Sequence, residues 1–138
     1  MKLHTFLNYG GNCEQALRFY EQHLGGKITM LMRRGEQPDQ PMKWPGWEQT
    51  VQYGYMELGE TQLMASDVPP NHFQPMRSAY LTLTVDGAAE ADRVWGLLAE
   101  GGEVLMPIEE TFFATRFGQL RDRFGTLWMI MALKPQAA

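Results

Sequence analysis

The sequence has a single cysteine among its 138 residues, which excludes a disulfide within the chain and fits a reducing compartment. It has no surplus of positive charge: its formal charge of −4 argues against nucleic acid or an anionic membrane surface as a partner. No apolar run approaches the roughly 20 residues that span a bilayer. The first residues, MKLHTFLNYGG, lack the apolar core of a secretory signal. We therefore expect a cytoplasmic protein without nucleic acid or membrane partners.

Motifs of several common enzyme classes are also missing. The segment YGGN, residues 9–12, lacks the G-x-G-x-x-G spacing of a dinucleotide-binding turn. No nucleophile–base pair is evident, because Ser66 and Ser78 flank a linker and Cys13 begins a helix. A thiol at a helix start can be activated by the helix dipole, but a lone cysteine is more often a small buried hydrophobe, and we favour that interpretation.

What the sequence does contain is a weak internal repeat. Shifted by 76 residues, LHTFLNYGGNCEQALRFYEQHLGGKIT falls on AYLTLTVDGAAEADRVWGLLAEGGEVL. The coincident pairs are Leu7 with Leu83, Gly11 with Gly87, Phe19 with Trp95, Gly25 with Gly101, Gly26 with Gly102, and Ile28 with Val104. Each half therefore predicts a strand, a helix, a Gly-Gly stop and a second strand.

Period-two alternation predicts the strands, and apolar residues at helical spacing predict two helices. We expect strands at 3–9, 27–33, 50–58 and 61–66, and again at 79–86, 103–108, 114–122 and 126–133. The first helix is predicted to be capped by Asn12, with Gln15 three residues on, and to end at Gly25. The second is predicted to be capped by Asp86 and to end at Gly101.

The last two strands of each half are predicted to form a hairpin, and the hairpins match at a shift of 65. Gly59 and Glu60 suit the tight turn of the first hairpin. The 11 extra residues lie in the loop 34–49, which is either a lid over the sheet or a surface loop whose Trp44 and Trp47 pack on the core. Residues 67–78, with three prolines, form the linker between modules 1–66 and 79–138, which together make one domain.

Four segments carry a family resemblance: FLNYGGNCEQALRFYEQHLGGKI, LMASDVPP, LAEGGEV and EETFFATRFGQLRDRFGTLWMI. With the doubled β-α-β-β-β pattern, they resemble the vicinal oxygen chelate superfamily, which includes glyoxalase I, bleomycin-resistance proteins and extradiol dioxygenases, and within it the PhnB-like branch. The resemblance implies an α+β fold of two tandem β-α-β-β-β modules that form a cup-shaped sheet with the helices outside. It also implies a homodimer.

The metal-dependent members of that superfamily use four His, Gln or Glu ligands from the first and last strand of each module. Carried over by position, the first-strand sites are His4 and Tyr80, and the last-strand sites are Met64 and Met129. Thioethers and a phenol are poor ligands for hard or borderline divalent ions. The resemblance therefore implies no catalytic metal here, and we interpret His4 as a polar wall residue. We expect no other cofactor.

Glu57 keeps a metal-dependent alternative open. It is predicted to pair with Gln62 across the first hairpin and to share a face with Tyr55 and Met64. If that register were slightly different, Glu57 would replace a missing ligand. The protein would then be a lyase, isomerase or dioxygenase that uses His4 and Glu57.

The predicted lining of the cup is aromatic and rich in methionine, with a few hydrogen-bonding groups. It comprises His4, Phe6, Asn8, Tyr53, Tyr55, Glu57, Met64, Tyr80, Thr82, Thr84 and Met129. The segment PIEETFFATRFG adds Glu110, Phe112 and Arg116 near the rim. Arg116 would hold an anionic group and a buried Glu would act as acid or base, unless these charges are simply solvated.

This composition predicts a small-molecule-binding protein of the PhnB-like kind, which holds an apolar, partly anionic organic ligand without catalysis. The metal-dependent enzyme is one alternative, and a non-catalytic module whose filled cup only holds a dimer together is another. Proteins of this branch are often labelled demethylubiquinone methyltransferases. The chain, however, has no glycine-rich strand–turn–helix motif for S-adenosylmethionine.

Overall fold

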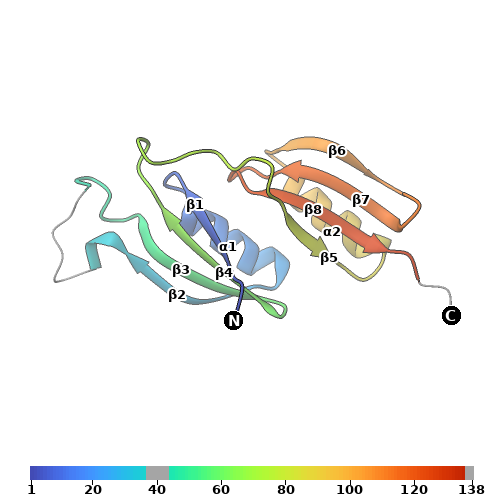
Figure 1. Ribbon diagram of the computed structural model, residues 1–138, viewed down its shortest axis with the longest axis horizontal. Helices are drawn as coiled ribbons and strands as arrows, with labels where there is room; N and C mark the ends of the chain where they lie inside the picture. The colour runs from blue at the N-terminus through green and yellow to red at the C-terminus, as the bar shows by residue number, and fades with distance from the viewer. Residues whose placement is uncertain (37–43, 136–138) are drawn as a thin grey trace. The chain divides into compact units, whose positions relative to one another are not determined.

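The computed structural model describes residues 1–36 and 44–135. The chain divides between Gln74 and Pro75 into two compact units (Figure 1). The first unit contains β1 (Thr5–Tyr9), α1 (Cys13–Leu24), β2 (Lys27–Arg33), the short 3-10 helix η1 (Arg34–Glu36), β3 (Val51–Leu58) and β4 (Thr61–Asp67). The second contains β5 (Leu81–Thr84), α2 (Ala88–Ala99), β6 (Glu103–Glu109), β7 (Ala114–Arg121) and β8 (Leu127–Leu133). The predicted α+β class, with two tandem β-α-β-β-β modules, is confirmed.

Both sheets have the same topology. The strand order is β1-β4-β3-β2 in the first unit and β5-β8-β7-β6 in the second. The first strand of each unit pairs with the last in parallel, and the remaining pairs are antiparallel. The first and last strands of each unit are therefore neighbours at one side of the sheet.

One helix covers one face of each sheet (Figure 1). Cys13, Ala16, Leu17 and Tyr20 of α1 are buried, and so are Met56, Leu63 and Ala65 on the strands beneath. In the second unit the buried residues are Ala91, Val94 and Leu98 of α2 with Leu120, Trp128 and Ile130 of the sheet. Burial of each large apolar side chain contributes about 1.5–3 kcal/mol. The predicted apolar stripes of the two helices, packed on the sheets, thus form the core of each unit.

A glycine in the third strand of each unit allows the helix to approach closely. A Cβ atom added at Gly54 would lie 2.7 Å from Leu17 Cδ1. One added at Gly118 would lie 2.6 Å from a ring carbon of Trp95 and 2.9 Å from Ile108 Cα. The bare backbone at these two positions therefore makes room for α1 and α2.

Neither helix begins with the predicted side-chain cap. Asn12 occupies the N-cap position of α1, but its side chain makes no capping hydrogen bond there. The N-cap of α2 is Gly87 rather than Asp86. At α1 the backbone N–H of Cys13 donates instead to Asp67 Oδ1, at 2.9 Å. The N-cap position of Asn12 is thus confirmed without its side-chain hydrogen bond, since an acid distant in sequence accepts from the start of α1, and the prediction of Asp86 is wrong.

The ends of several elements also differ from the prediction. The left-handed cap at Gly25 (φ 76°) is confirmed, whereas α2 ends at Ala99 with Glu100 as its C-cap in place of Gly101. β1 and β5 are shorter than predicted: their paired residues run only from Thr5 to Tyr9 and from Leu81 to Thr84. The two helices of the described residues are too short to cross a membrane.

Candidate functional site: the open faces of the two sheets

Each sheet has an open face, which is the face that its own helix does not cover. In the first unit, register places an apolar row across all four strands of this face: Phe6 on β1, Met64 on β4, Tyr55 on β3 and Met30 on β2. We call these four residues the first methionine row. Phe6 keeps 47% of its surface exposed, and the other three are half-buried. The row is therefore an accessible apolar strip.

Polar residues border the first methionine row on one side. Glu57 lies opposite Gln62 on β4 and opposite Lys27 on β2, and all three lie on the open face. His4 is exposed and directly precedes β1. On the other side of the row, Tyr53 lies opposite Met32. The predicted pairing of Glu57 with Gln62, and its face shared with Tyr55 and Met64, are confirmed.

The second unit repeats this arrangement. Thr82 on β5, Met129 on β8, Gln119 on β7 and Met106 on β6 are aligned across its open face, and we call them the second methionine row. A neighbouring row holds Thr84, Met131 and Phe117. Met106 keeps 42% of its surface exposed, and Met129 and Met131 are half-buried. The second methionine row has no charged residue, whereas the neighbouring row continues on β6 to Glu109, which lies opposite Phe117.

A β-bulge brings Met30 and Met106 onto the open faces. Ile28 lies opposite the buried Met56, so strict alternation would turn Met30 to the helix side as well. The register shifts between Ile28 and Met30, and it shifts again between Val104 and Met106. The sequence prediction missed both methionines for this reason. The signal that would have found them is their identity at the repeat distance of 76 residues.

Phe117 and Gln119 were missed for a different reason. Tyr55 lies opposite Met64, whereas Gln119 lies opposite Met129. Tyr55 and Met64 are nine positions apart in the chain, whereas Gln119 and Met129 are ten apart, so β7 matches β3 at a shift of 64. The shift of 65 holds for β4 and β8 alone. Applying it to β3 and β7 as well hides the equivalence of Tyr55 with Gln119.

The four positions of the family's metal ligands do not assemble a suitable donor set. His4 and Tyr80 directly precede β1 and β5, and Met64 and Met129 lie on the open faces. Two thioethers and a phenol leave one imidazole as the only good donor for a borderline divalent ion. Within residues 1–36 and 44–135, no three His, Cys, Asp or Glu side chains are grouped to hold a metal. These residues do not fit the metal of the superfamily's enzymes.

The predicted rim residues of the second unit lie in different surroundings. Arg116 Nε is 3.0 Å from Asp92 Oδ1 on α2, which places its guanidinium on the helix side of the sheet. The prediction that Arg116 holds an anionic ligand at the rim is therefore not supported by its position, because α2 supplies its partner. Glu110 lies 3.9 Å from Lys134 Nζ. Phe112, 92% exposed, contacts Phe113, which contacts Phe117.

The described part of the loop 34–49 packs near the turn between β1 and α1. Trp47 lies against Gly11. The ring of Trp44 stacks on the Arg34 guanidinium at 4.3 Å and lies near His72. This arrangement agrees with the alternative in which the tryptophans pack on the protein. Residues 37–43, which belong to the proposed lid, lie outside the described residues.

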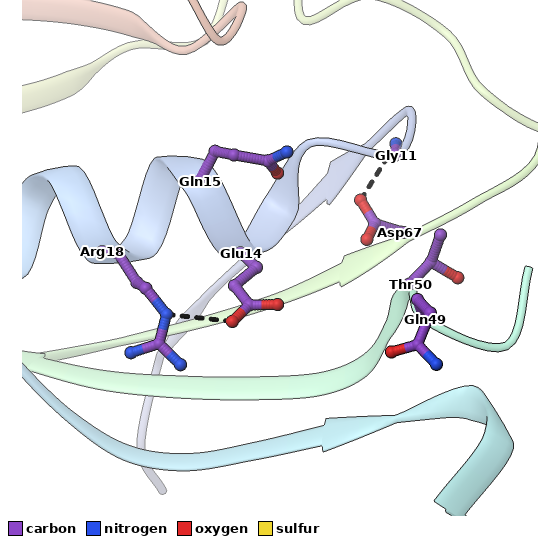
Figure 2. A pocket seen from close by; sticks show the side chains of 7 residues that line it. All are labelled: Gly11, Glu14, Gln15, Arg18, Gln49, Thr50 and Asp67. Atoms are coloured by element: carbon purple, nitrogen blue, oxygen red, sulfur yellow. Dashed lines mark hydrogen bonds and ion pairs between the residues drawn. The ribbon is translucent and has the colours of Figure 1, made fainter.

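A separate hollow of about 410 Å³ lies at the start of α1 (Figure 2). It is lined by Gly11, Glu14, Gln15, Arg18, Gln49, Thr50 and Asp67. Its charged groups are satisfied within the protein: Glu14 forms ion pairs with Arg18 at 2.9 Å and Arg33 at 2.8 Å. Partial burial alone would raise the pKa of Glu14, but these arginines hold it below its ordinary value.

Asp67 is the structural centre of this region. Its buried carboxylate accepts hydrogen bonds from the backbone N–H groups of Gly11 (3.0 Å), Cys13 (2.9 Å) and Val51 (2.9 Å). Arg34 Nη2 donates to its backbone carbonyl. Burial raises the pKa of Asp67, while the three N–H groups and the charge of Arg34 offset part of that effect. Asp67 thus joins the β1–α1 turn to the start of β3.

We expect the thiol of Cys13 to be inert in the folded protein. Cys13 is fully buried, and burial, followed by the negative charges of Asp67 and Glu14, raises its pKa far above the ordinary value. A thiol-reactive disulfide dye should label no cysteine in native protein and one cysteine per chain after unfolding in guanidinium chloride. Rapid stoichiometric labelling of the native protein would contradict the packing of α1.

Comparison with known proteins places this architecture in a recognised group. A family model described as "Glyoxalase/Bleomycin resistance protein/Dioxygenase superfamily" matches residues 2–130. Protein YjdN of Escherichia coli (strain K12) is 29% identical over 144 residues, which cover 99% of this chain and 98% of that protein.

Two solved structures resemble the chain over nearly its whole length. The crystal structure of protein PA1353 from Pseudomonas aeruginosa has 35% identity and a TM-score of 0.88, and the match covers 98% of this chain and 99% of that one. A Bacillus cereus structure described as "Putative 3-demethylubiquinone-9 3-methyltransferase, PhnB protein" has 30% identity and a TM-score of 0.81, with 96% and 99% coverage.

Proposed function

Since this chain belongs to the glyoxalase/bleomycin resistance protein/dioxygenase superfamily and has PhnB-like relatives, we propose that it binds a small apolar organic molecule without a catalytic metal. Each unit offers one binding surface, the open face of its own sheet, centred on its own methionine row. The single observation that carries the proposal is that these rows stay accessible while the opposite face of each sheet is buried under a helix.

The residue types of the rows suit such a ligand. Tyr and Phe rings present large apolar surfaces, and the unbranched thioether side chains of methionine adapt to irregular shapes. Thr82 and Gln119 in the second row, and Glu57 and Gln62 beside the first, add a few groups that orient a ligand by hydrogen bonds. Because Arg116 is paired with Asp92, the proposed ligand does not include an anionic group held by that residue.

Neither enzyme alternative is supported by the site. The residues at the superfamily's metal positions do not fit a divalent metal, so no step is assigned to one. The methyltransferase named for the B. cereus protein uses a methyl donor, and the present sequence has no glycine-rich strand–turn–helix motif for S-adenosylmethionine. Binding without chemistry requires only the apolar faces.

Titration with the neutral fluorescent dye Nile red tests this proposal. We expect saturable binding to the native protein. Phe6→Ala should lower the affinity of the first unit's face about tenfold, and Met106→Ala that of the second unit's face, because each removes an apolar contact. Val104→Ala is the matched control: Val104 lies on the same strand as Met106 and is 48% exposed, but it faces the helix side opposite Leu120. Absence of saturable binding, or equal loss in all three variants, would contradict the proposal.

A further inference from the structure

The two methionine rows agree in their sulfur-bearing positions and differ elsewhere. Met30 and Met106 occupy equivalent bulged positions on β2 and β6, and Met64 and Met129 occupy equivalent positions on β4 and β8. Between them, Tyr55 corresponds to Gln119 and Phe6 to Thr82. The feature common to both rows is therefore two methionine thioethers, one on each side of a central strand.

These thioethers are accessible, whereas a neighbouring one is not. Met106 is 42% exposed, and Met30, Met64 and Met129 are half-buried. Met56 follows Tyr55 on β3 but faces α1 and is fully buried. Because susceptibility to oxidation follows exposure, a small oxidant would reach the four row methionines long before Met56.

We propose that Met30, Met64, Met106 and Met129 are sites of reversible oxidation by hydrogen peroxide, which weakens ligand binding at the open faces; this rests on the function proposed above. In each event the thioether sulfur attacks one peroxide oxygen, an S–O bond forms and the O–O bond breaks. The sulfur loses two electrons, and the departing oxygen leaves as water after proton transfer. Methionine sulfoxide and water are the products, and a thiol-dependent sulfoxide reductase reverses the change.

The consequence follows from the chemistry of the row. A sulfoxide is polar and accepts hydrogen bonds, so it places a strong dipole in the middle of an apolar strip. An apolar ligand would then have to displace water from that oxygen without replacing its hydrogen bonds. Oxidation of a solvent-facing side chain leaves the helix-covered cores of both units intact.

The experiment treats full-length protein with graded hydrogen peroxide, maps each methionine by peptide mass spectrometry and measures Nile red affinity in the same samples. We expect the four row methionines to oxidise about tenfold faster than Met56, which is the internal control. Dye affinity should fall about tenfold as the row methionines oxidise, and it should recover after treatment with methionine sulfoxide reductases. A variant that combines M30L, M64L, M106L and M129L should bind the dye and lose less of its affinity after peroxide than the parent protein does, although the half-buried Met131 beside the second row remains oxidisable in it.

Every other outcome contradicts one part of the proposal. Row methionines that oxidise no faster than Met56 overturn the assignment of the sites, even when the untreated protein binds the dye. Oxidation without loss of affinity, or an equal loss in the fourfold leucine variant, overturns their regulatory role. Failure of untreated protein to bind the dye at all overturns the proposed function, and the regulatory role with it.

Discussion

Replacing Asp67 by alanine is expected to lower the free energy of unfolding by about 3–5 kcal/mol. The substitution removes the acceptor of three backbone N–H groups, those of Gly11, Cys13 and Val51. Asp67 is 1% exposed, so water has little access to replace the lost hydrogen bonds. Chemical denaturation followed by circular dichroism measures the change.

Asp86→Ala is the matched control for this prediction. Asp86 is an exposed acid just before α2, where the sequence predicts a helix cap. The N-cap position, however, is held by Gly87. We expect its replacement to change stability by less than about 0.5 kcal/mol. Equal losses in the two variants would mean that Asp67 is no more than an ordinary surface acid.

Replacing Gly118 by alanine is expected to destabilise the protein by about 3 kcal/mol. The new methyl group would lie 2.6 Å from the Trp95 ring and 2.9 Å from the Ile108 backbone, so neither a rotamer change nor a small side-chain movement relieves both contacts. The second unit would have to separate α2 from its sheet. Denaturant unfolding, with the m-value compared between variants, measures the loss.

Substitutions of two other glycines serve as controls for this prediction. Gly54→Ala should cost less, because its new methyl group meets the flexible end of Leu17, which can move. Gly96 lies inside α2 with nothing within 4 Å of an added Cβ, so Gly96→Ala should stabilise the protein by about 0.5–1 kcal/mol. A Gly118→Ala variant as stable as the parent would show that α2 does not pack as closely as described.

Much of the fold was predictable because its signals are local. Alternation in the strands and the apolar stripes of α1 and α2 identified the two β-α-β-β-β units, and the pairing of Glu57 with Gln62 followed from a two-residue turn. The cap of α1 was not predictable in the same way. Asn12 has the right residue type in the right place, but Asp67, 54 residues beyond Cys13, accepts the hydrogen bond.

By itself, the sequence determined the duplication, the order of the elements and the lack of good metal donors at His4, Tyr80, Met64 and Met129, since each of these depends on residue identity and short-range spacing. Only the tertiary structure decided which face Met30 and Met106 occupy and that Arg116 pairs with Asp92. A bulge reverses the side-chain alternation of a strand, and its position depends on pairing with another strand. An ion pair between a strand and a helix likewise depends on packing that no short segment encodes.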